Sequence, residues 1–450
     1  MLVEEDGTIR AESSCALQNL NVATVEHGSE QDPADWIVAL ESALDELFAE
    51  PFHREVEAIA VDSTSGTVLP VNDAGDPLGM AFLYNDMRAQ VEAEECASVF
   101  SGSCSPTFSL PKILWMRKHL DLADDCLFLH ATDFVNAWLI GTSEVPTDFT
   151  NAMKSGVDLE TNTWSTAMPA LRLPEVVAPG QTIGVLSERW CKRWQLRTGI
   201  VVVSGATDSN AAFYASGAAE PGDWSTTIGT TLAIKGLSED QLHDPEARIY
   251  CHKHPDGAWL PGGASNAGGE ILRARFAGRM DELEDVAGER TATEHLIYPS
   301  PRTGERLPFS SSEFRPFCEG DPSDEVGYFL GCLEGVACVE AMVFGLLESL
   351  GGVVGDTVFA TGGAASSALG LQIRADLLQK LLVVPAHPNS AMGAAILAAA
   401  GYLEKPVGEL SRQLTLMQRA VEPNPERADY YQERLALFKQ HCEEALANAS

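Results

Sequence analysis

The stretch GIVVVSGATDSNAAFYASGAAEPGDWSTTIGTTLAIKG, residues 199–236, decides the fold. Its β-branched run, 200–203, is typical of a buried strand, and the Ser204-Gly205 pair predicts a tight turn at the end of that strand. Asp208 lies on this turn and precedes a helix-compatible segment, 209–218. We therefore expect its carboxylate where a strand becomes a helix, with backbone on both sides fixing its orientation.

The second feature of this stretch is a set of hydroxyls around one glycine, STTIGTT, at 225–231. Backbone N–H groups freed by a glycine turn suit phosphate oxygens. Taken singly, an Asp at a helix start is often only an N-cap, and a hydroxyl-rich hairpin is often only a turn. Together they favour a phosphoryl transferase, in which one group accepts a hydroxyl proton and another neutralises the moving phosphoryl group.

The amino-acid composition limits the classes of function that this chain can have. The chain has 450 residues, enough for two domains with full cores, and 65 Asp+Glu against 30 Lys+Arg give a net charge of −35. This charge argues against nucleic acid or an anionic membrane as a partner. Ten scattered cysteines favour reduced thiols, and no apolar run approaches the ~20 residues of a membrane span. The start of the chain is acidic and carries no signal-peptide core.

Other polar turns follow predicted strands in the first half. Ser65 lies in the turn DSTSGT after the predicted strand 57–61, and Asp86 and Arg88 lie where the strand 81–84 ends. The simpler interpretations are an ordinary turn at Ser65 and a local contact of Asp86 with Arg88. We favour a pocket for the second pair, because a carboxylate and a guanidinium can recognise vicinal hydroxyls by paired hydrogen bonds.

In the second half, a glycine-rich loop, 257–269, enters a helix at Glu270, and the strand 357–360 ends in a small-residue turn, TGGAASS, at 361–367. Only small residues let an adenine ring lie flat on the backbone. A cluster at 251–254, CHKH, is the one metal-like pattern, and it lacks a second ligand pair at zinc spacing. We therefore do not expect a zinc site there.

These motifs, in this order, resemble the FGGY family of carbohydrate kinases, and within it the D-ribulose and D-xylulose kinases of cyanobacteria and plants. The resemblance covers about residues 3–440 and implies an α/β protein with two actin-like (ribonuclease H-like) domains around a central cleft. We place an N-terminal sugar-binding domain at 1–195 and a C-terminal domain with the catalytic Asp and the nucleotide site at 196–450. Relatives begin with a strand and glycine turn, D-F-G-T-S-G-A-R, whose counterpart is missing before Val3. Either the sequence as given begins late, or the protein lacks one wall of its phosphate site.

The resemblance also implies roles for single residues. Asp208 would be the general base, and the sugar would contact four residues: Ser65, Asp86, Arg88 and Ser209. The ATP contacts would be Gly229, Thr230, Thr231, Gly268, Gly362, Gly363 and Ala364. No metal ligands are assigned, although Mg²⁺ is expected because the negative chain would otherwise repel ATP.

The predicted function is ATP-dependent phosphorylation of a ketopentose, with D-ribulose first and D-xylulose second. A catalytically silent sugar- or nucleotide-binding homologue is the alternative, because the first phosphate turn is absent. The expected protein is cytoplasmic, binds small molecules only, and is a monomer or a homodimer.

Overall fold

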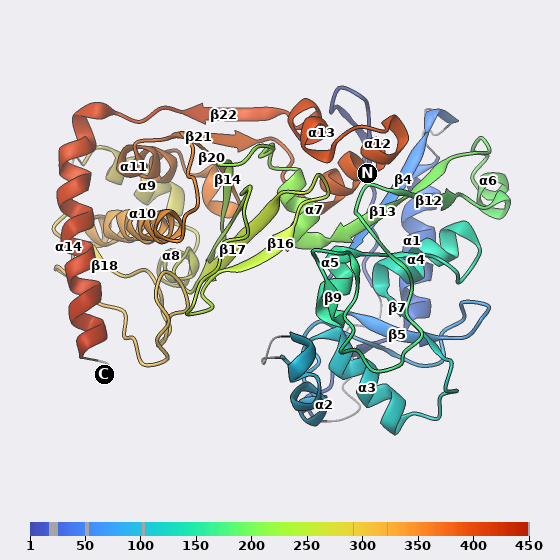
Figure 1. Ribbon diagram of the computed structural model, residues 1–450. Coiled ribbons are helices and arrows are strands. Elements are labelled where there is room, and N and C mark those ends of the chain that lie inside the picture. The colour runs from blue at the N-terminus through green and yellow to red at the C-terminus, as the bar shows by residue number, and fades with distance from the viewer. Residues whose placement is uncertain (18–25, 50–53, 101–103, 291, 322, 449–450) are drawn as a thin grey trace. The chain divides into compact units, whose positions relative to one another are not determined.

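The computed structural model describes residues 1–17, 26–49, 54–100, 104–290, 292–321 and 323–448. The chain forms two units: Met1–Ala215 with Asn389–Leu414, and Ser216–Pro388 with Thr415–Ser450. Figure 1 shows that each unit combines helices with sheet, which confirms the predicted α/β class.

The first unit contains a three-stranded sheet and a four-stranded sheet. The first has the order β12-β13-β4, formed by Thr182–Val185, Val201–Thr207 and Ala58–Ser63. The second has the order β3-β6-β5-β7, formed by Glu30–Gln31, Ala81–Phe82, Val68–Val71 and Leu127–His130. Three short strand pairs complete it: β1 (Leu2–Val3) with β2 (Ile9–Ala11), β8 (Thr147–Asp148) with β11 (Val176–Val177), and β9 (Val157–Asp158) with β10 (Thr163–Trp164).

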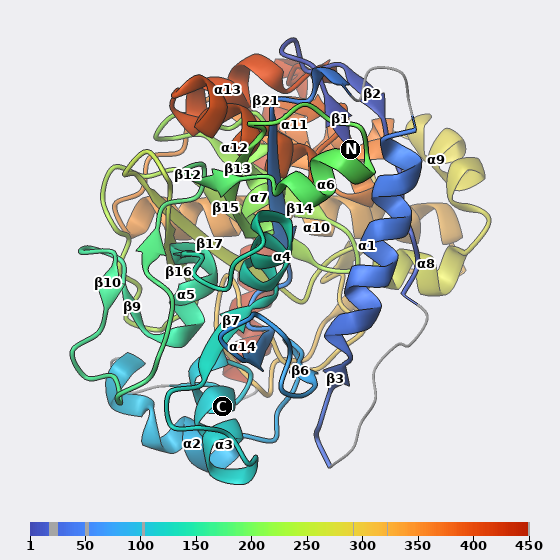
Figure 2. The same ribbon diagram turned by 90° about the vertical axis from the view of Figure 1, so that its right-hand side faces the viewer.

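Helices cover these sheets with apolar faces. The helix α1 (Pro33–Leu47), labelled in Figure 2, begins at the N-cap Asp32. With α4 (Ala131–Ile140) it packs on the four-stranded sheet through Trp36, Ile37 and Phe134. The other helices of the unit are α2 (Gln90–Glu95), η2 (Ala97–Phe100), α3 (Ser109–His119), α5 (Phe149–Ala152), η3 (Met153–Ser155), α6 (Glu188–Arg193), α7 (Asp208–Tyr214), α12 (Ser390–Leu403) and α13 (Val407–Leu414).

The predicted turn at Ser204-Gly205 is wrong, because β13 continues through it to Thr207. The strand pairs in parallel with β4, and between Val203 and Ala206 it advances three residues while β4 advances two, from Ala60 to Asp62. This irregularity is a β-bulge. A Cβ built on Gly205 would overlap the carbonyl oxygen of Val61, so glycine is what permits the two backbones to approach.

The division of the chain differs from the predicted boundary near residue 196. β13 lies after that residue, but it belongs to the first unit because it pairs with β4. Residues 389–414 also return to the first unit, since α12 packs closely on α7. Here too a glycine allows the contact, because a Cβ on Gly393 would overlap the carbonyl oxygen of Ala211.

The second unit is built on a seven-stranded sheet of order β16-β17-β15-β14-β20-β21-β22. β14 and β20 are parallel, as are β20 and β21, and the remaining neighbours are antiparallel. The strands in this order are Tyr250–Lys253, Trp259–Ser265, Leu232–Gly236, Trp224–Ile228, Thr357–Thr361, Leu381–Pro385 and Met417–Val421. A separate pair joins β18 (Leu296–Ile297) to β19 (Cys318–Glu319).

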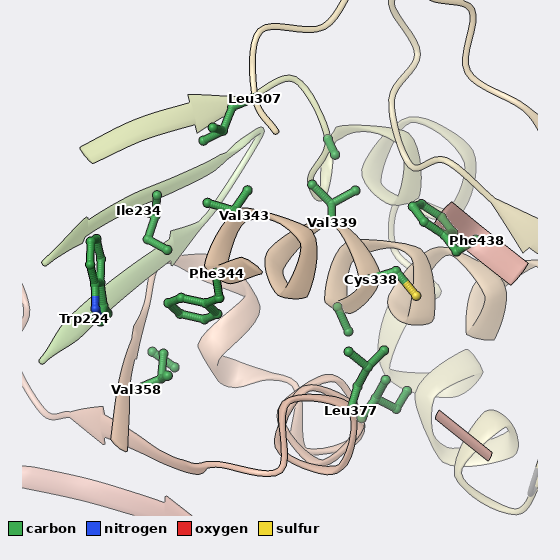
Figure 3. Packing of buried hydrophobic residues seen from close by; sticks show 14 of the residues in the cluster. Trp224, Ile234, Leu307, Cys338, Val339, Val343, Phe344, Val358, Leu377 and Phe438 are labelled. Atoms are coloured by element: carbon green, nitrogen blue, oxygen red, sulfur yellow. The ribbon is translucent and has the colours of Figure 1, made fainter. Parts of the chain in front are cut away.

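The core of the second unit lies between this sheet and α10 (Glu325–Ser349). Figure 3 shows Val343 and Phe344 of α10 beside Trp224, Ile234 and Val358 of the sheet. By length and composition α10 could cross a membrane, but 72% of its most apolar window is buried inside the protein. The other helices of this unit are α8 (Glu270–Phe276), α9 (Met280–Gly288), η4 (Gly363–Ser366), α11 (Ala368–Leu378), η5 (Pro425–Arg427) and α14 (Ala428–Ala447).

We expect Gly205→Ala to lower the melting temperature by at least about 5 °C, because the new methyl group must push β13 away from β4. Thermal unfolding followed by circular dichroism measures this change. Gly79→Ala is the matched control in the same unit, since no described atom lies within 4 Å of a Cβ at that position. Equal melting temperatures for the two variants would contradict this account of β13.

A second prediction concerns Lys112 of α3, which is fully buried. Its Nζ donates hydrogen bonds to the carbonyl oxygens of Gly66, at 2.9 Å, and Leu83, at 2.6 Å. Burial lowers the pKa of Lys112 from its usual 10.5 to about 7. Between these two values the unfolded chain holds the proton and the folded chain does not, so the free energy of unfolding should rise with pH from 7 upward.

Denaturant unfolding of the wild type and Lys112→Met at pH 7, 8 and 9 tests this expectation. The free energy of unfolding should rise less with pH in Lys112→Met than in the wild type. This difference in slope is expected even though the loss of two hydrogen bonds lowers the stability of the variant at every pH. Lys439→Met, which changes an exposed lysine of α14, is the control and should keep the wild-type rise. If the free energy of unfolding rose equally with pH in the wild type and in Lys112→Met, the conclusion that Lys112 is buried in its neutral form would be wrong.

Candidate active site

Asp208 is the first residue of α7, directly after β13, as predicted. Its side chain is half-buried, and its Oδ1 accepts a hydrogen bond of 2.7 Å from the N–H of Ser209. The residue before it, Thr207, donates its N–H to Thr150 Oγ1 at 2.9 Å and accepts a bond of 2.8 Å from Asn210 Nδ2. The strand–helix junction is therefore held from both sides, and the carboxylate of Asp208 keeps one orientation. Ser209 is exposed beside it.

A second carboxylate, Asp62, lies at the end of β4 opposite Ala206 of β13. Burial raises the pKa of Asp62, a hydrogen bond with Ser390 at the start of α12 opposes this shift, and the nearby charge of Asp208 adds to it. Asp62 was within a polar turn in the sequence interpretation, but it received no role. The parallel register of β4 and β13 brings Asp62 close to Asp208. The sequence does not indicate this proximity, because the two residues lie far apart along the chain.

Ser65 accepts a hydrogen bond of 2.7 Å from Lys154 Nζ. Lys154 lies on η3, which follows α5, and α5 is tied to the junction at Asp208 through the Thr150–Thr207 bond. Burial lowers the pKa of Lys154, and the charge of Asp208 acts in the opposite direction. Ser65, Lys154 and Asp208 thus belong to one electrostatic neighbourhood of the first unit.

Sequence reasoning missed Lys154. The sequence offered one signal, a lysine two residues before a glycine in a chain with few cations. The structure adds that Gly156 has a φ of +91° and ends a short helix, and that Lys154 is half-buried.

Asp86 and Arg88 are close together, but neither is open to a sugar. The side chain of Asp86 is 0% exposed, and its oxygens accept bonds from Ser29 N–H, from the backbone of Arg88 and from the Arg88 guanidinium. Arg88 is 4% exposed, pairs also with Glu30 at 2.5 Å, and stacks on the ring of Phe82 at 3.8 Å. The sequence pattern favours direct recognition of a sugar by Asp86 and Arg88, but the structure favours the simpler alternative, a local contact between them. Both carboxylate oxygens of Asp86 already accept hydrogen bonds from the protein.

In the second unit, Gly229, Thr230 and Thr231 form the turn between β14 and β15. The turn is closed by Gly229 N–H donating to Thr231 O at 3.0 Å. Gly268 lies against it, since a Cβ there would come within 2.5 Å of Thr230 O. Only glycine permits this approach, so the predicted glycine-rich loop and the hydroxyl turn do come together.

The second turn, at Gly362, Gly363 and Ala364, follows β20, the parallel neighbour of β14. Gly362 has a φ of +80°, and a Cβ on it would lie 2.7 Å from Ile228 O. Thr361 and Thr227 join the two strands through a hydroxyl–hydroxyl bond of 2.7 Å. No described atom lies within 4 Å of a Cβ built on Gly229 or Gly363, so there is open space beside both turns.

The seven residues predicted to contact ATP are thus grouped in the second unit, at the ends of β14 and β20 and at the start of α8. In α/β sheets, ligands bind outside the carboxyl ends of the parallel strands. The exposed Thr230 and half-buried Thr231 on one turn and the small residues on the other would suit a nucleotide, with phosphates at the first and adenine at the second. Among the residues that the structure describes, no three His, Cys, Asp or Glu side chains are grouped as for a metal ion.

Comparisons with known proteins agree with this geometry. Two family models match the chain: the N-terminal domain of the FGGY family of carbohydrate kinases over residues 1–214, and its C-terminal domain over 225–402. A xylulose kinase of Lactococcus lactis is 22% identical, covering 98% of this chain and 93% of its own length. A xylulose kinase of Bacillus subtilis is 23% identical with the same coverage.

Among solved structures, the xylulose kinase of Rhodospirillum rubrum is similar with a TM-score of 0.81 at 24% identity, covering 95% of this chain and 93% of that one. The predicted two-domain, actin-like (ribonuclease H-like) fold is confirmed by this likeness. The finer expectation of a D-ribulose kinase is not supported, since these relatives are named xylulose kinases. With both domain models matched in order along the chain, this protein belongs to the FGGY family of carbohydrate kinases.

Proposed function

We propose that this ATP-dependent sugar kinase phosphorylates a hydroxyl of a ketopentose, with D-xylulose as the first candidate. The observation that carries the proposal is the pairing of two turns in the second unit. The Gly229–Thr231 and Gly362–Ala364 turns end two adjacent parallel strands and leave open space beside them. Such a pair of turns suits the phosphates and the adenine of one nucleotide.

Asp208 is the proposed general base. A carboxylate with one orientation, half-exposed at a strand–helix junction, can accept the proton of a sugar hydroxyl as the oxygen attacks phosphorus. Ser65 and Ser209 are proposed to hydrogen-bond the other hydroxyls of the sugar. We assign Asp86 and Arg88 a supporting role behind this surface, because their buried contacts orient the segment between Ser29 and Arg88.

The nucleotide would be held by Gly229, Thr230, Thr231 and Gly268 at its phosphates, and by Gly362, Gly363 and Ala364 at its adenosine. Mg²⁺ needs only one or two carboxylates when phosphate oxygens and water complete its octahedral shell. Asp62, the half-buried carboxylate at the end of β4, fits that modest requirement. When bound, the ion would neutralise charge on the phosphates, which the negative chain would otherwise repel.

D-xylulose replaces D-ribulose as the preferred sugar because several of the most similar relatives are named xylulose kinases. The two ketopentoses differ only in the configuration of one hydroxyl, so the pocket must distinguish them by the placement of hydrogen-bonding groups such as Ser65. The ten scattered cysteines are free thiols, which fits a reducing compartment, so we also propose a cytoplasmic enzyme; a monomer or a homodimer is proposed for its oligomeric state.

A coupled assay of ADP release with D-xylulose, D-ribulose, gluconate and glycerol tests the substrate class. We expect turnover with the ketopentoses and the highest kcat/KM with D-xylulose. Gluconate is included because a gluconokinase of Bacillus subtilis is 24% identical over 82% of this chain. Sugar and ATP binding without turnover of any of the four would instead support the catalytically silent alternative.

The role of Asp208 makes a separate prediction. Asp208→Asn keeps the size of the side chain but cannot accept the proton, so kcat should fall by about 10²–10⁴-fold while the Kd for ATP stays within about twofold. Asp240→Asn, at an exposed loop position of the second unit, is the matched control and should keep full activity. Undiminished turnover in Asp208→Asn would remove Asp208 from the role of base.

A further inference from the structure

Arg273 is an exposed residue in the middle of α8, the helix that follows the glycine-rich loop. Its Nη2 donates a hydrogen bond of 2.5 Å to Thr230 Oγ1, on the proposed phosphate turn. Within the described ranges, no carboxylate forms an ion pair with it. The remaining N–H groups of its guanidinium are therefore available to a ligand at this turn.

Several arginines of the same unit pair with carboxylates, whereas the side-chain partner of Arg273 is the hydroxyl of Thr230. Arg279 pairs with Glu325 at 3.0 Å, Arg302 pairs with Glu270 at 2.6 Å, and Arg248 pairs with Asp244 at 2.8 Å. Acidic residues outnumber basic ones by 65 to 30 in this chain, so carboxylate partners are abundant. An arginine that instead lies on a threonine hydroxyl at an anion-suited turn indicates a site for an external anion.

The backbone fixes where α8 begins relative to the turn. Gly269 N–H donates to Gly229 O at 2.9 Å, and Glu270 N–H donates to Thr230 O at 3.2 Å. The first helical bond then runs from Arg273 N–H to Gly269 O at 3.0 Å. Arg273 is thus one helical turn away from a start that is bonded to the phosphate turn, and its long side chain returns to Thr230.

We propose that Arg273 binds the terminal phosphates of the nucleotide, by turning its guanidinium from Thr230 to the phosphate oxygens. The inference rests on the proposed ATP site at Gly229–Thr231. A guanidinium can donate two parallel hydrogen bonds to a phosphate group, and this charge-assisted geometry is stronger than its bond to a neutral hydroxyl. In a protein of net charge −35, such a local cation offsets part of the repulsion that a triphosphate meets.

Isothermal titration calorimetry tests the proposal. The full-length wild type and the variants Arg273→Met, Arg273→Lys and Arg279→Met are titrated with ATP, ADP and adenosine in the presence of Mg²⁺. We expect Arg273→Met to weaken ATP binding by at least about tenfold. Adenosine affinity should be unchanged, because that ligand lacks the phosphates. Arg273→Lys should regain part of the loss through its charge, and Arg279→Met, a matched exposed arginine with a carboxylate partner, should bind ATP like the wild type.

The outcomes separate this inference from the proposed function. If Arg273→Met bound ATP with the same affinity as the wild type, the inference on Arg273 would be overturned, and the proposed function would stand. An equal loss for ATP and adenosine would also overturn it, because the arginine would then only support the fold of the turn. If the wild type bound no ATP, the proposed nucleotide site would fail, and the inference would fail with it.

Discussion

Close backbone contact at the ends of parallel strands is the constraint on which the rest of the structure depends. In the first unit β13 lies against β4, and Gly205 leaves no room for a side chain beside Val61. In the second unit β20 lies against β14, and Gly362 meets Ile228 in the same way. Because parallel strands end at the same edge of a sheet, each contact brings together two turns of the candidate site.

The charges of the molecule fall into two groups with different physical roles. Asp86, Arg88 and Lys112 are buried, and each has its strong hydrogen-bonding directions used within the protein. Burying the Asp86–Arg88 ion pair costs desolvation energy that the pairing only partly offsets, and Lys112 avoids this cost by losing its proton, so all three contribute a defined geometry more than stability. Asp208 and Lys154 are half-buried, and they are therefore able to exchange a protein partner for a ligand.

The strong acidity of the chain gives the few cations near the candidate site a larger importance. Screening by salt limits the repulsion of an anion to about 8–10 Å at physiological ionic strength. Within that distance, a phosphate at the proposed site would meet the Gly229–Thr231 turn and the guanidinium of Arg273, whereas distant surface charge would be screened. A chain with a net charge of −35 can accordingly present a site that suits a triphosphate.

The sequence by itself determined the family, the α/β class, the strand–helix junction at Asp208 and the two glycine turns. These features depend on local rules: β-branched runs, glycine where a turn or a close approach needs it, and hydroxyls next to it in the chain. Only the tertiary structure decided that β13 runs through Ser204-Gly205, that residues 389–414 rejoin the first unit, and that Asp86 and Arg88 are buried. It also placed Lys154 on Ser65 and Arg273 on Thr230, pairs that are 89 and 43 residues apart. Contacts at such separations depend on strand register and helix packing, which no local pattern of residues encodes.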